Sequence, residues 1–102
     1  MGIRYVVINE QIKEENKLSV DYGAWIIKGE EGEAAVEPGS AAEKAGLKEK
    51  DIILEFNNEK ITTDNSLAKI IQKYDPGDSV ILKVLRDNEE KLISVTLGER
   101  GE

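Results

Sequence analysis

The stretch from Pro38 to Phe56, PGSAAEKAGLKEKDIILEF, constrains the fold of this chain more than any other part of the sequence. Ser40 suits the N-cap of a very short helix, because its hydroxyl can accept from a backbone N–H two or three residues further on. Gly46 suits the left-handed residue that ends such a helix. Asp51 precedes a strongly apolar strand, and its carboxylate can accept from backbone N–H groups of the intervening turn. We therefore expect a rigid corner in which a small-residue helix lies close against a sheet.

The composition excludes several classes of function. The 102 residues contain no histidine, so neither a Ser-His-Asp triad nor a histidine metal site can be built from them. They contain no cysteine, which excludes disulfides and thiolate metal sites. The net charge of −7 argues against nucleic acid or an anionic membrane surface as a partner. We expect no catalytic residues and no enzymatic activity in this chain alone, no cofactor, no metal and no membrane insertion.

The rest of the sequence alternates between strand and helix signals. Apolar and β-branched runs predict strands at residues 3–8, 22–28, 34–37, 51–56, 79–86 and 91–98. The first of these runs is apolar on both faces, which predicts a buried strand. Two main helices are predicted at residues 40–47 and 62–74, and the second and longer one places Leu67, Ile70 and Tyr74 along one stripe. Asn9 can cap a further short helix over residues 10–17, for which a plain loop is the alternative.

These elements predict one domain of the α+β class, mainly β. We expect a small, partly open β-barrel or sandwich of about six strands, capped by the two main helices. The domain is expected to span residues 1–98. Residues 99–102 are expected to be a disordered tail or an artificial end of the chain.

Two stretches, PGSAAEKAGLKEKDIILEFNNEKI and DPGDSVILKVLRDNEEKLISVTL, resemble the PDZ family, and the resemblance covers residues 2–97. The chain departs from the family pattern at Lys50 and Asn58, where glycine is usual. Lys50 implies either a backbone that avoids positive φ or a slightly strained one, whereas Asn58 tolerates positive φ. The resemblance implies a PDZ-like fold whose function is to bind the free C-terminus, or an extended segment, of another polypeptide by β-strand addition.

The resemblance also implies where the peptide binds. The family holds the terminal carboxylate on backbone N–H groups of a glycine-containing loop, and residues 1–3 (MGI) match that loop. By this correspondence Gly2 and Ile3 donate to the carboxylate. The helix at residues 62–74 then faces the peptide. Asp64, at the mouth of the groove, suits either a contact with a ligand side chain or the N-cap of the helix, and we favour the cap. The expected peptide contacts are Gly2, Ile3, Arg4, Tyr5, Asp64, Ala68 and Ile71.

The order of the strands resembles one subgroup of the family. No strand precedes the loop at residues 1–3, so the C-terminal strand must supply the missing partner, as in circularly permuted PDZ domains of bacterial envelope proteases. The start GIRYVVI and the short helix after it are similar to HtrA (DegP-type) serine proteases. This resemblance implies an upstream trypsin-like protease domain as a partner, a regulatory or substrate-recognition role in protein quality control, and an extracytoplasmic location. The alternatives are a C-terminal-processing or intramembrane metalloprotease as the parent, or a docking domain with an unused groove.

Overall fold

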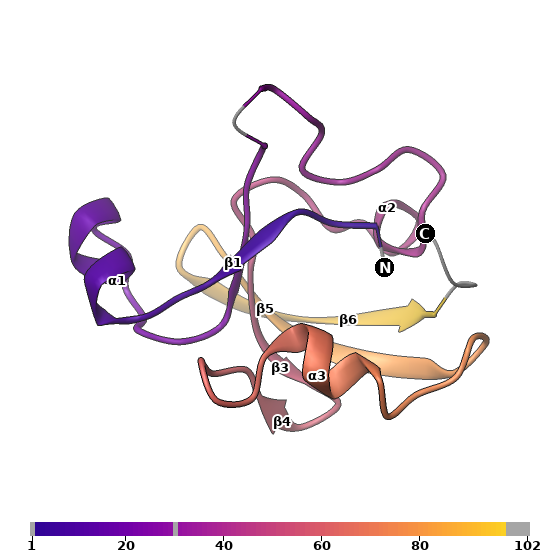
Figure 1. Cartoon of the computed structure of the whole chain (residues 1–102). Coiled ribbons are helices and arrows are strands. Elements are labelled where there is room, and N and C mark those ends of the chain that lie inside the picture. Colours follow the sequence, from indigo (N-terminus) through magenta and orange to yellow (C-terminus); the bar gives the residue numbers. More distant parts are fainter. Residues whose placement is uncertain (1, 30, 98–102) are drawn as a thin grey trace.

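The computed structural model describes residues 2–29 and 31–97. In those residues the chain forms six strands and three helices (Figure 1). In chain order they are β1 (Tyr5–Val7), α1 (Glu10–Asn16), β2 (Ala24–Ile26), α2 (Ala41–Ala45), β3 (Ile52–Phe56), β4 (Glu59–Lys60), α3 (Leu67–Ile71), β5 (Ser79–Arg86) and β6 (Glu89–Thr96). The predicted class, mainly β with helical caps, is confirmed.

The strands form one antiparallel sheet in the order β1-β2-β3-β5-β6, and β4 pairs with β3 beside this path. The two longest strands, β5 and β6, pair over eight residues from Ser79↔Thr96 to Arg86↔Glu89. β6 therefore lies beside β5, and within residues 2–29 and 31–97 it does not pair with β1. β1 and β6 lie at the two ends of the sheet order, so each has one side that no neighbouring strand of this sheet covers.

The predicted corner around α2 is confirmed. The Ser40 hydroxyl accepts from the backbone N–H of Glu43 at 3.2 Å, and Gly46 ends the helix with φ 90°. Leu47 follows in the core at 4% exposure. The Asp51 Oδ2 atom accepts from the backbone N–H of Lys48 at 3.0 Å, which closes the turn in front of β3.

The corner has a further partner, Arg86, at the end of β5. Its Nε and Nη2 atoms donate to the two carboxylate oxygens of Asp51 at 2.8 and 2.6 Å, and Nη2 also donates to the Gly46 carbonyl at 3.0 Å. Asp51 is 2% exposed, so this two-pronged contact neutralises a buried charge. The hydrogen bond to Asp51 raises the pKa of the Arg86 guanidinium. Nothing in the local sequence indicated this pairing, which joins residues 35 positions apart.

The short helix after β1 is confirmed as α1. Asn9 caps it, and its Oδ1 atom accepts from the backbone N–H of Ile12 at 2.7 Å. α1 lies at one side of the molecule, away from α2 (Figure 1). It covers a small second core of Ile8, Ile52 and Leu54, distinct from the main core that lies against α2 and α3.

The prediction of a long helix over residues 62–74 is wrong. The Thr62 hydroxyl accepts from the backbone N–H of Asn65 at 3.0 Å, and the two residues also exchange backbone hydrogen bonds, so this segment forms its own turn. α3 begins only after Ser66, whose hydroxyl accepts from the Lys69 N–H at 3.2 Å. The expected N-cap, Asp64, therefore lies in the turn before the helix. α1, with seven residues, is longer than α3 with five.

The strands also differ from expectation in three respects. Residues 34–37 do not form a strand and contribute only a single bridge, Ile3↔Val36, whereas residues 59–60 form the short β4. β1 is half-buried rather than buried, because it lies at the end of the sheet. Lys50 has φ 74°, so the strained alternative is the one observed, and Asn58 has φ 73° as its tolerance allows.

Candidate functional site

One side of β1 is taken up by hydrogen bonds to the rest of the domain. The Arg4 carbonyl accepts from the Ile27 N–H at 3.1 Å, and the Ile8 N–H donates to the Gly23 carbonyl at 2.8 Å. Val6 is paired with Trp25 between these two contacts. The even-numbered residues of this segment therefore direct their backbone groups toward β2.

The other side of β1 is open. Because backbone groups alternate between the two sides of an antiparallel strand, those of Ile3, Tyr5 and Val7 point away from β2. Among the residues that the structure describes, no strand pairs with this side of β1. An exposed row of strand donors and acceptors of this kind is a template for a further strand.

The face of β1 beside this open side is apolar. Ile3 and Tyr5 pack, half-buried, against the main core, and so does Ile71 of α3. Leu67 and Ile70 of α3 lie fully within that core. We call Ile3, Tyr5 and Ile71 the β1–α3 strip.

Tyr5 connects the two elements that flank this strip. Burial raises the pKa of its phenol, and the backbone N–H of Ala68, in the first turn of α3, partly offsets that rise. The effect of this N–H indicates that the Tyr5 phenol lies near the start of α3.

The loop before β1 contains a glycine in a left-handed backbone conformation. Gly2 has φ 80°, a value that glycine adopts without the steric cost that a side chain would bring. Its carbonyl accepts from the Glu37 N–H at 2.8 Å, and the Arg4 N–H donates to the Ala35 carbonyl at 2.9 Å. The Ile3 N–H lies between these contacts and points to the open side. Met1, the first residue of the expected loop, lies outside the described residues.

The structure brings together some of the predicted contact residues and separates others. Ile3, Tyr5 and Ile71 share the strip, with Gly2 at its end and Ala68 exposed at the start of α3. Asp64 is exposed in the turn before α3, where its carbonyl accepts from Lys69 Nζ at 3.4 Å.

Arg4 lies on the opposite face of β1 from Tyr5, because adjacent strand residues face opposite ways. Its charge acts on Glu33, whose pKa is lowered chiefly by backbone N–H groups and further by Arg4. Arg4 therefore faces the loop that contains Glu33 rather than α3.

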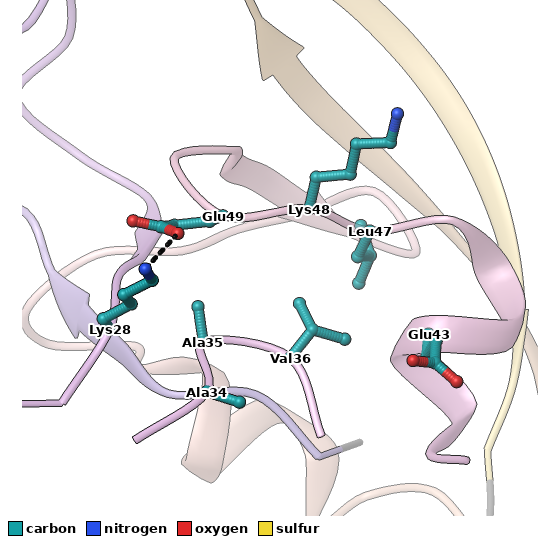
Figure 2. A pocket seen from close by; sticks show the side chains of 8 residues that line it. All are labelled: Lys28, Ala34, Ala35, Val36, Glu43, Leu47, Lys48 and Glu49. Atoms are coloured by element: carbon teal, nitrogen blue, oxygen red, sulfur yellow. Dashed lines mark ion pairs between the residues drawn. The ribbon is translucent and has the colours of Figure 1, made fainter. Parts of the chain in front are cut away.

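An open depression of about 350 Å³ lies elsewhere, beside α2 (Figure 2). Val36, Ala35 and Leu47 form its apolar floor, and the Lys28–Glu49 ion pair at 3.8 Å stands at its side. The expected contact residues do not line it. It is therefore separate from the β1–α3 strip.

The chain belongs to the PDZ family, because the family model described as "PDZ domain" matches residues 1–97. A curated relative from Marinomonas sp. (strain MWYL1), "Probable periplasmic serine endoprotease DegP-like", is 39% identical over 98% of this chain. The chain covers 20% of that relative and thus spans about a fifth of the length of the curated relatives it matches.

Solved structures agree with this assignment. The HtrA3 PDZ domain bound to a phage-derived ligand (FGRWV) has a TM-score of 0.73 and 25% identity, covering 94% of this chain and 82% of that chain. "HtrA-type protease AlgW with decapeptide" has a TM-score of 0.74 at 18% identity, covering 99% of this chain and 29% of that one, which supports the fold alone. The domain is therefore of the kind found in HtrA and DegP-like serine proteases. None of the helices in residues 2–29 and 31–97 has the length and apolar character needed to span a bilayer.

Proposed function

We propose that this domain binds the C-terminal end, or an extended segment, of another polypeptide, which joins the sheet as a strand along the open side of β1. The observation that carries the proposal is the combination of backbone at Ile3, Tyr5 and Val7 that no strand of the described residues pairs with and the half-buried strip beside it. A strand added there gains main-chain hydrogen bonds, and every second side chain of the peptide faces the strip.

The peptide's terminal carboxylate would bind at the end of the strip next to Gly2. The positive φ of Gly2 turns the chain so that the N–H groups of Gly2 and Ile3 can converge on one anion. Glycine also leaves room for the carboxylate to approach the backbone closely. Ile71 and Ala68 are the proposed contacts from the helix side.

The two remaining contacts, Arg4 and Asp64, are proposed to act at the margin of the site. Both are exposed, and neither lies in the strip. Their charges would act on ligand side chains that point away from the sheet, where attraction through solvent is weak.

In the parent protein, the domain is proposed to serve as the regulatory or substrate-recognition domain of an HtrA-like serine protease outside the cytoplasm. Support comes from the relatives, whose names describe periplasmic serine endoproteases and of which this chain matches about a fifth. The upstream protease domain would be its partner and would supply the catalytic residues. A C-terminal-processing or intramembrane metalloprotease as parent is less well supported, because the relatives reported above are serine proteases.

The test compares two peptides of one sequence, one with a free C-terminal carboxylate and one with an amidated C-terminus. Isothermal titration calorimetry should show binding of the free-carboxylate peptide, with amidation reducing affinity by about tenfold or more, because charge-assisted hydrogen bonds are lost. Equal affinity for both peptides would contradict the carboxylate site while leaving strand addition in place. No binding of either would contradict the proposed function.

A further inference from the structure

The position of the Tyr5 side chain sets the room that a ligand has between β1 and α3. Tyr5 starts on the sheet edge and packs half-buried against the main core, as Ile71 of α3 does, and the Ala68 N–H of α3 partly offsets the rise in the phenol pKa that burial causes. A half-buried phenol ring therefore already stands on the face of β1 that the side chains of an added strand would share.

The backbone of α3 explains why the phenol lies near the start of this helix. The first N–H groups of a helix have no partner within the helix. In α3, the Ser66 hydroxyl accepts from one of them, that of Lys69, at 3.2 Å. The Ala68 N–H precedes it and lowers the pKa of the Tyr5 phenol, against the larger rise that burial causes.

An added strand would compete with this ring for space. If the peptide's carboxylate binds at Gly2 and Ile3, its terminal residue lies beside Ile3 and Tyr5, and its side chain faces the strip. Interiors are close-packed, so a large terminal side chain would have to push the Tyr5 ring out of its contacts with the core and with α3. A methyl group would not.

We propose that Tyr5 is a specificity-determining residue that restricts the ligand's terminal side chain to a small one, such as that of alanine, and disfavours phenylalanine. The proposal rests on the peptide-binding function proposed above. It concerns the size of the terminal side chain only.

The experiment measures calorimetric affinities for two free-carboxylate peptides that differ only in their last residue, alanine or phenylalanine. The wild-type domain should bind the alanine peptide about tenfold more tightly, a ratio within the range that apolar pockets achieve. Tyr5→Val removes the ring and keeps a residue that favours strands, so it should reverse the preference. Tyr5→Phe keeps the ring and should retain the wild-type preference.

Tyr22→Val is the matched control. Tyr22 packs against the second core under α1, so this variant loses the same atoms away from the strip and should keep the wild-type preference. Circular dichroism checks that each variant is folded.

Two outcomes would overturn the proposal in different ways. If the wild-type domain binds the phenylalanine peptide as tightly as the alanine peptide, and Tyr5→Val leaves that ratio unchanged, Tyr5 does not set the size limit and peptide binding itself stands. If neither the wild type nor any variant binds either peptide, the proposed function fails and the size limit fails with it.

Discussion

The corner around α2 and the β1–α3 strip differ in whether their polar groups have hydrogen-bond partners within the domain. At the corner, the buried Asp51 carboxylate receives hydrogen bonds from Lys48 and Arg86, and Ser40 and Gly46 satisfy the two ends of the helix. Along the strip, one side of β1 has no partner strand in the described part of the chain.

This difference separates residues that hold the fold from residues that await a partner. A polar group that is satisfied within the domain has nothing to offer a ligand, and removing its partner costs stability. An unpaired strand edge contributes little to stability and gains its hydrogen bonds only when another chain arrives. Substitutions at the corner should therefore lower stability, and substitutions along the strip should lower peptide affinity.

The largest effect is expected from Arg86→Ala. The variant leaves the Asp51 carboxyl, which is 2% exposed, without its main partner, so we expect a loss of about 3 kcal/mol in the free energy of unfolding. Urea denaturation measures it. Lys83→Ala removes another cation from β5, whose pairs with Glu55 and Glu90 are longer and only partly buried, and it should leave stability nearly unchanged. Similar losses in the two variants would contradict a structural role for the corner.

A smaller effect is expected from replacing two glycines that share a backbone conformation, Gly46 with φ 90° and Gly2 with φ 80°. A Cβ at Gly46 would meet no atom within 4 Å, so Gly46→Val tests backbone strain alone and should cost about 2 kcal/mol of unfolding free energy. Gly46→Asn should cost less, because asparagine tolerates this region.

Gly2→Val should differ from Gly46→Val in its effect on binding. Gly2 is buried, its carbonyl accepts from the Glu37 N–H and the Arg4 N–H donates to Ala35, so part of the strain remains and we expect a loss of about 1 kcal/mol. Peptide affinity should fall strongly, because the N–H groups no longer converge. A Gly2→Val domain that binds peptide as well as the wild type would remove the basis for distinguishing the two glycines.

Local capping signals made the corner predictable from sequence. The residues of each cap at Asn9, Ser40 and Gly46 lie within a few positions of one another, so the pattern determines the geometry. The start of α3 was ambiguous for the same reason, since Thr62, Asp64 and Ser66 are all good caps. The Thr62 hydroxyl accepts from Asn65 in the preceding turn, so it does not cap the helix, and Ser66 caps it instead.

Contacts between distant residues left no local signal. The pairing of Arg86 with Asp51 depends on the register between β3 and β5, which the sequence alone does not specify. The approach of Tyr5 to Ala68 likewise depends on how β1 lies against α3. Of the candidate site, the glycine of the loop before β1 and the apolar residues of β1 and α3 were predictable, whereas the nearness of Tyr5 to the start of α3 was not.

Two-dimensional ¹H–¹⁵N NMR spectra, recorded while an unlabelled free-carboxylate peptide ending in alanine is added, test the central claim most directly. The account predicts that the backbone amide resonances of Ile3, Tyr5 and Val7 shift, because their N–H groups gain partners, while those of the α2 corner stay in place. Shifts confined to β6, the other end of the sheet order, with β1 unchanged, would contradict it.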